Sequence, residues 1–331
     1  MAQEFASDRY DTMLYRRCGR SGLKLSAISL GAWETYGGYR GEDVARECFF
    51  KAFDLGITHF DLANNYGTPP GNAETVCGKI VKEMPRDELI ISSKAGYTMW
   101  PGPYGDWGSR KYIIASCDQS LKRMGLEYFD IFYHHRPDPD TPLEETLGAL
   151  DTLVKQGKAI YAGVSNYGGA HFADAVRVAD RKNYAPITIH QPYYNMLGRT
   201  VEWDLLPQAE RAGTGVIPFC PLASGLLTDK YLNGIPEGSR ATDRWGEDWV
   251  KNNLSPERLA TLKELNEIAK LRGQTLAQMS LAWLLRLPAI TSALIGASSA
   301  KQIEENVAAL KNMEFSEDEL TKIDALTKKP A

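Results

Sequence analysis

The feature that most constrains this chain is a repeated unit in which an amphipathic helix is followed by a glycine and then by a short strand. The segment 43–55 carries apolar residues at helical spacing, Gly56 follows it, and 57–60 contains β-branched and aromatic residues. The same order recurs over 143–164 and over 205–219. Strands that alternate with helices build a parallel sheet.

Eight strands are expected in total, the number that closes a parallel sheet into a (β/α)8 TIM barrel; a doubly wound open sheet is the competing topology. Residues 10–26 predict an N-terminal β-hairpin. Segments 97–109 and 220–254 contain several Gly, Pro and Trp residues and predict long loops on the C-terminal face. We find no linker, so a single domain over 1–331 is expected. The other strands are expected at 27–30, 89–92, 129–133, 187–190 and 292–295.

Composition and charge narrow the class of protein. The chain has 331 residues, of which 43% are hydrophobic and 24% are charged, and its formal net charge is −4. These values are typical of a globular protein and exclude a disordered or coiled-coil chain. The acidic balance argues against nucleic acid or an anionic membrane as a partner.

The cysteines and the first residues bear on the cell compartment. The five cysteines form no CxxC pair, and the N-terminus lacks the basic and apolar regions of a signal peptide. No apolar run reaches the ~18 residues that a membrane helix needs. We therefore expect a cytoplasmic protein with reduced thiols.

Several motifs that carry chemistry are absent from the sequence. There is no GxGxxG or P-loop for phosphates, no HExxH for zinc and no GxSxG for a nucleophilic serine. The two adjacent histidines, His134 and His135, should point to opposite faces of a strand and cannot easily share one metal ion. We therefore expect no metal site.

Polar residues instead follow five successive expected strands. Each has an ordinary reading when taken alone, as a turn cap, a solvated charge or a packing residue. The active sites of parallel barrels lie at the C-terminal ends of the strands, where these side chains should meet. If these polar and charged groups are buried together, pairing with one another costs the least free energy. The residues are Asp61 and Tyr66, Lys94, His135, Ser165 and Asn166, and Gln191.

Five segments resemble the aldo-keto reductase superfamily, in order and over about residues 13–325. Within it, the chain is most similar to the branch of bacterial glyceraldehyde 3-phosphate reductases and potassium channel β subunits. The segments are GITHFDLANNYG at 56–67, SK at 93–94, DIFYHHRP at 130–137, GVSN at 163–166 and LIGAS at 294–298. The resemblance implies NADPH-dependent reduction of an aldehyde to an alcohol.

The resemblance implies a catalytic tetrad of Asp61, Tyr66, Lys94 and His135. The histidine lies five residues after Asp130, which selects His135 over its neighbour. Tyr66 would act as general acid, and Lys94 would favour its phenolate by about 4 kcal/mol at ~4 Å and an effective dielectric of ~20. Asp61 would orient Lys94, and His135 would hold the substrate carbonyl.

The resemblance also implies the residues that bind NADPH. Phe219 would stack on the nicotinamide, while Lys230 and Arg240 would pair with the 2′-phosphate. Cys220, where serine is usual, suggests sensitivity to oxidants as a hypothesis. The full expected set is Trp33, Ser165, Asn166, Gln191, Phe219, Pro221, Leu222, Gly225, Lys230, Arg240, Gly296, Ser298, Gln302, Glu305 and Asn306.

Basic residues near the 97–109 loop suggest an acidic substrate. Arg110 and Lys111 begin an expected helix, and helix starts and basic side chains suit an anion. We expect a small phosphorylated aldehyde such as glyceraldehyde 3-phosphate, with methylglyoxal as a secondary substrate. The expected substrate contacts are Trp33, Tyr66, Trp100, Arg110 and Lys111.

Two other functions remain open at this stage. One is an NADPH-binding sensor, similar to the channel β subunits, with weak catalysis; His135, where those subunits commonly carry Asn, argues against it. The other is a barrel lyase in which Lys94 forms a Schiff base. The branch also implies a homo-oligomer, a tetramer or larger.

Overall fold

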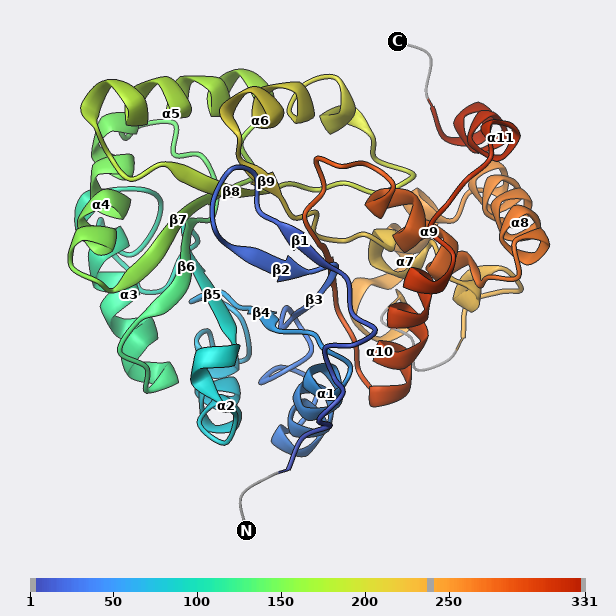
Figure 1. The fold of residues 1–331 in the computed structure, drawn as a ribbon, viewed down its shortest axis with the longest axis horizontal. Coiled ribbons are helices and arrows are strands. Elements are labelled where there is room, and N and C mark those ends of the chain that lie inside the picture. The colour runs from blue at the N-terminus through green and yellow to red at the C-terminus, as the bar shows by residue number, and fades with distance from the viewer. Residues whose placement is uncertain (1–3, 237–240, 329–331) are drawn as a thin grey trace.

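The computed structural model describes residues 4–236 and 241–328, and strands alternate with helices along it as expected (Figure 1). Glycines in the left-handed conformation follow α1 at Gly56 and α6 at Gly213. The strands are β1 (Tyr15–Arg17), β2 (Lys24–Ser26), β3 (Ile28–Gly31), β4 (His59–Asp61), β5 (Ile90–Ala95), β6 (Phe129–His134), β7 (Ala159–Ser165), β8 (Ile187–Gln191), β9 (Gly215–Val216) and β10 (Ala293–Ile295).

The helices surround the strands, with α8 and α11 lying outermost (Figure 1). They are α1 (Glu42–Asp54), α2 (Asn72–Val81), α3 (Arg110–Met124), α4 (Leu143–Lys155), α5 (Gly169–Lys182), α6 (Leu206–Ala212), α7 (Gly246–Asn253), α8 (Pro256–Leu271), α9 (Leu276–Leu285), α10 (Ala300–Val307) and α11 (Glu317–Thr327). The segment expected as a loop over 220–254 contains α7, and a 3-10 turn, η6 (Ala308–Lys311), follows α10.

Eight strands form one parallel sheet in the order β10-β3-β4-β5-β6-β7-β8-β9. A parallel bridge between Val216 and Ile290 joins its two ends, and the Leu294 amide donates to the Pro218 carbonyl over 3.1 Å. The sheet is therefore a closed (β/α)8 barrel, and the doubly wound alternative is wrong.

The N-terminal hairpin, β1 and β2, closes the N-terminal end of the barrel. The Arg20 amide donates to the carbonyl of Gly213, just before β9. Buried hairpin residues Cys18, Leu23 and Leu25 pack with apolar side chains from inside the barrel. The open end of the barrel is therefore the C-terminal one, where α/β barrels carry their sites.

The inside of the barrel is divided between apolar and polar side chains. Inward residues of β6 and β8, such as Tyr133 and Ile189, belong to the apolar cluster beneath the mouth. The alternate positions of β3, β4 and β5 carry Ser29, His59, Asp61, Ser92 and Lys94, all buried. Alternation along a strand sends every second residue to one face, so these polar groups face one another.

Candidate active site

The centre of the candidate site is an ion pair between Lys94 on β5 and Asp61 on β4. Lys94 Nζ donates to Asp61 Oδ2 and, over 2.6 Å, to the carbonyl of Leu62. The side chains are 0% and 1% exposed. An isolated charge at this depth would be very costly, so each group requires the other.

Tyr66 and His135 lie beside this pair. Lys94 Nζ is 5.0 Å from the centroid of the Tyr66 ring, and the rings of Tyr66 and His135 meet edge to face with centroids 5.8 Å apart. The His135 amide donates to the Ala95 carbonyl over 2.8 Å, which anchors it next to β5. The buried Nδ1 atom of His135 has no hydrogen-bond partner among the described residues. The structure thus brings the four side chains of the expected tetrad together.

Burial shifts the pKa values of three of these groups. It lowers the pKa of Lys94, against the opposing effect of Asp61. It raises the pKa of Tyr66 well above 10.0, and it lowers the pKa of His135 well below 6.5. The net shift of the Tyr66 pKa is thus opposite to the one expected, because burial and the carboxylate of Asp61 penalise the phenolate and outweigh the favourable charge of Lys94. The phenol is held protonated and the imidazole neutral.

Three polar residues expected to bind the cofactor are hydrogen-bonded into the same cluster. Gln191 Nε2 donates to Asp61 Oδ1 over 3.2 Å, and Ser165 Oγ donates to the Gln191 carbonyl over 2.8 Å. Asn166 Nδ2 donates to the His135 carbonyl over 3.0 Å. Asn166 has φ 62°, a left-handed conformation that asparagine tolerates better than most residues. These three side chains therefore lie at the barrel mouth beside the ion pair.

The segment after β9 also borders the mouth. The partly exposed ring of Phe219 meets Tyr193 edge to face, with centroids 5.7 Å apart. Cys220 is partly exposed, whereas the other four cysteines are buried and none of the five is in a disulfide. Arg240 lies outside the described residues. Further expected residues here are Pro221, which is buried, Leu222 and Gly225, which are partly exposed, and Lys230, which is exposed.

The start of α10 holds the remaining expected cofactor residues. The N-cap is Ser299, whose hydroxyl accepts from the Gln302 amide. The Ser298 amide instead donates to Gln302 Oε1 over 2.8 Å. Glu305 is exposed and Asn306 is buried. A Cβ atom built on Gly296, which ends the strand segment before α10, would meet no atom within 4 Å.

Two tryptophans were expected to contact the substrate. Trp33 follows β3 and is 45% exposed. Trp100 packs against Tyr112 of α3, with ring centroids 5.3 Å apart. The Tyr112 hydroxyl donates to the Tyr97 carbonyl and accepts from Asn64 Nδ2, which fixes the loop after β5 on α3.

Arg136 is a cation near the site that the sequence analysis missed. Its Nη2 atom donates to Asp106 over 2.8 Å, and its guanidinium carbon lies 4.3 Å from the Tyr97 centroid and 3.6 Å from that of Trp107. Arg136 therefore fastens the loop after β5 to the end of β6. Its position in the sequence, directly after His135 at a strand end, could have indicated that it lies near the site.

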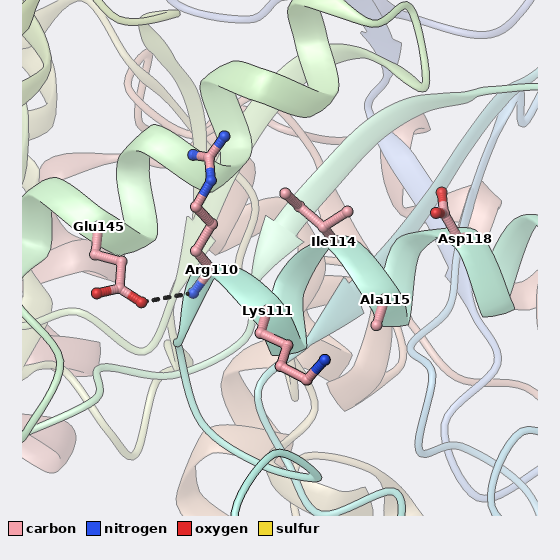
Figure 2. A pocket seen from close by; sticks show the side chains of 6 residues that line it. All are labelled: Arg110, Lys111, Ile114, Ala115, Asp118 and Glu145. Carbon is pink, nitrogen blue, oxygen red and sulfur yellow. Dashed lines mark hydrogen bonds between the residues drawn. The ribbon is translucent and has the colours of Figure 1, made fainter.

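The side chain of Arg110 is bound to α4, whereas Lys111 Nζ lies 5.3 Å from the ring centroid of Tyr104 in the loop after β5. The Arg110 guanidinium donates to the Gly148 carbonyl over 2.9 Å and to Thr152 Oγ1 over 2.7 Å, both on α4. Glu145 already accepts from the Arg110 amide over 3.0 Å (Figure 2). Arg110 and Lys111 both line a groove of about 630 Å³ between α3 and α4. Helix α4 therefore supplies both the acceptors for the Arg110 side chain and the anion at its helix start, and the expected substrate contacts of Arg110 and Lys111 stay predictions.

The described part of the chain lacks two other features. In residues 4–236 and 241–328, no helix is long and apolar enough to cross a membrane. Over the same residues, no three His, Cys, Asp or Glu side chains group as metal ligands would.

The chain is similar to known proteins over most of its length. The model of the aldo/keto reductase family matches residues 27–328. The chain is 54% identical over 323 residues to the L-glyceraldehyde 3-phosphate reductase of Escherichia coli K12, covering 96% of this chain and 93% of that protein. It is 40% identical over 324 residues to a putative voltage-gated potassium channel subunit beta of Schizosaccharomyces pombe, covering 94% and 92%.

The contacts of Arg110 predict a structural role. Replacing Arg110 with Ala removes two hydrogen bonds to α4, and we expect the free energy of unfolding to fall by about 1 kcal/mol. Urea denaturation measures the change, and Lys111→Ala, which alters an exposed neighbour, is the matched control. Equal unfolding midpoints for the two variants would contradict this assignment.

Proposed function

The chain belongs to the aldo/keto reductase family, and we propose that it uses NADPH to reduce small aldehydes to alcohols, with glyceraldehyde 3-phosphate as the main substrate and methylglyoxal as a secondary one. The observation that carries the proposal is the buried Lys94–Asp61 pair next to Tyr66 and His135. The reductase relatives support the phosphorylated substrate.

The roles of the four side chains follow from their protonation states. The Tyr66 phenol is held protonated, so it can donate the proton that the carbonyl oxygen requires. The neutral imidazole of His135 can donate a hydrogen bond to the same oxygen without adding charge. Lys94, kept charged by Asp61, stabilises the phenolate that remains after the proton has left. His135 and Tyr66 thus approach the carbonyl from two sides.

The mouth of the barrel fits a nicotinamide cofactor, which supplies the hydride when bound. The amides of Asn166 and Gln191 lie within the tetrad's hydrogen-bond network, and Phe219 presents a partly exposed ring beside them. The open space at Gly296 lets a ligand approach the backbone closely. The exposed ammonium of Lys230 suits a 2′-phosphate, which favours NADPH over NADH.

The sensor alternative draws support from the similarity to a channel subunit. A sensor needs only to bind the cofactor, whereas the proximity of Tyr66 to Lys94 and His135 supports a chain that also transfers a proton. Turnover therefore separates the two functions. Assembly into a tetramer or larger and a cytoplasmic location stay predictions from the resemblance.

The first test of the proposal removes the proton donor. Tyr66→Phe keeps the ring and deletes only the hydroxyl, and we expect kcat with NADPH and L-glyceraldehyde 3-phosphate to fall by roughly 10²-fold or more. The measurement is the loss of NADPH absorbance. Cofactor affinity, followed by fluorescence titration, should stay near that of the wild type. Tight NADPH binding by the wild type without turnover of any aldehyde would instead favour the sensor.

The second test is the pH dependence of reduction. Burial lowers the pKa of Lys94 and raises that of Tyr66, so Lys94 is the first of the two to lose its proton as pH rises. We expect kcat/KM to fall on the alkaline side with an apparent pKa below the usual 10.5 of lysine. Lys94→Arg keeps the charge at all accessible pH, so its residual activity should lose this alkaline limb. An unchanged limb in Lys94→Arg would show that another group controls it.

A further inference from the structure

A continuous chain of hydrogen bonds runs through the polar half of the barrel interior to the ion pair. Ser292 Oγ lies 2.6 Å from Ser29 Oγ, which lies 3.0 Å from His59 Nδ1. His59 Nε2 lies 2.9 Å from Ser92 Oγ, and Ser92 Oγ donates to Asp61 Oδ1 over 2.6 Å. Of these five side chains, Asp61 alone belongs to the expected tetrad. All are 0–1% exposed.

The carboxylate of Asp61 sets the direction of every bond in this chain. A carboxylate only accepts hydrogen bonds, so the Ser92 hydroxyl donates its one hydrogen to Asp61. In its contact with His59, Ser92 must therefore be the acceptor. His59 therefore carries its proton on Nε2, and its Nδ1 accepts from Ser29. The Ser29 hydroxyl then accepts from Ser292. The donors all point toward Asp61.

From this geometry we propose that His59 is a positioning residue for the reduction: through Ser92 it holds the Asp61 carboxylate against Lys94, and Ser29 and Ser292 hold His59 in the tautomer that does so. The inference rests on the proposed function, because it assigns His59 a part in keeping Lys94 charged beside Tyr66. Nothing in the tetrad itself requires a histidine at this place.

Neutral His59 suits this part better than a charged group would. Burial lowers its pKa to about 4, so the ring stays neutral through the physiological range and adds no charge near Lys94. A neutral donor chain favours the carboxylate form of Asp61, and the carboxylate in turn raises the affinity of Lys94 for its proton. Without the chain, Gln191 would be the remaining neutral side-chain donor to Asp61.

The other ionisable groups around the pair come from several elements. Glu74 of α2 acts on the charge of Lys94 from a distance and is itself bound by Arg123 and Ser93. The rings of Tyr66 and Tyr133 lie 5.0 and 5.7 Å from Lys94 Nζ. The remaining groups are His135 at the end of β6, whose pKa Lys94 helps to lower, and Tyr97 and Cys220, which act on Tyr66. Asp61 Oδ1 accepts hydrogen bonds from Ser92 and Gln191.

A second buried histidine shows what a packing role looks like. His190 on β8 bonds the Tyr167 carbonyl through Nε2 over 3.0 Å and meets the ring of Phe172, with centroids 5.1 Å apart. Its contacts are with Tyr167 and Phe172, and among the described residues no hydrogen bond or ring contact joins it to Asp61 or Lys94. It is as buried as His59, so it offers a matched control.

Two substitutions of unequal length test the proposal. In His59→Gln the amide nitrogen is as many bonds from the backbone as Nε2, so it can still donate to Ser92, whereas in His59→Asn it is one bond short. We expect His59→Gln to keep kcat/KM within about threefold and His59→Asn to lose roughly tenfold, mainly in kcat. The alkaline limb of His59→Asn should move lower by up to about one pH unit, because Ser92 loses the donor that holds its hydroxyl on Asp61, a loss about the size of one hydrogen bond.

The control and a spectroscopic measurement make the outcome decisive. His190→Gln should lower thermal stability without moving the alkaline limb. Nitrogen NMR of histidine-labelled wild type, assigned with the His59→Gln variant, should show a neutral His59 ring protonated on Nε2 from pH 6 to pH 8. Protonation on Nδ1, or an unmoved limb in His59→Asn with an active wild type, would overturn this proposal alone. A wild type that binds NADPH and reduces no aldehyde would overturn the proposed function instead.

Discussion

The candidate active site is organised around one buried ion pair, Lys94 with Asp61. Such a pair gains little stability over apolar residues of the same size, because both charges lose their hydration. The barrel nevertheless surrounds it with donors to Asp61 and with the Leu62 carbonyl for Lys94. The proposed reduction accounts for the arrangement, because the pair holds a positive charge where the Tyr66 phenol would become a phenolate.

The closed barrel makes this placement possible. The apolar half of its interior, with Tyr133 and Ile189, packs on the hairpin and closes the N-terminal end. The polar half, from β3 to β5, carries hydrogen bonds from Ser292 to Asp61. The side chains that pack the barrel and those that surround the ion pair thus lie on different sides of its interior.

The sequence predicted the barrel and the grouping of the tetrad because both follow from short-range rules. Alternation of strands and helices specifies a parallel sheet, and strand ends specify where Asp61, Lys94 and His135 meet. Contacts between distant segments could not be predicted in the same way. Arg110 turns to α4 because Gly148 and Thr152 offer acceptors there, which spacing along the chain does not reveal. The pKa of Tyr66 likewise depends on how deeply the folded chain buries it.

The central claim is that the Asp61–Lys94 pair serves reduction and not the fold. The most direct measurement is NADPH-dependent reduction of L-glyceraldehyde 3-phosphate by the double variant Asp61→Leu/Lys94→Met, after urea denaturation has shown that it folds. Replacing both charges by apolar residues of similar size leaves no unpaired ion, so the account predicts a cooperatively folded protein without detectable turnover. Turnover at a rate comparable to the wild type would contradict it.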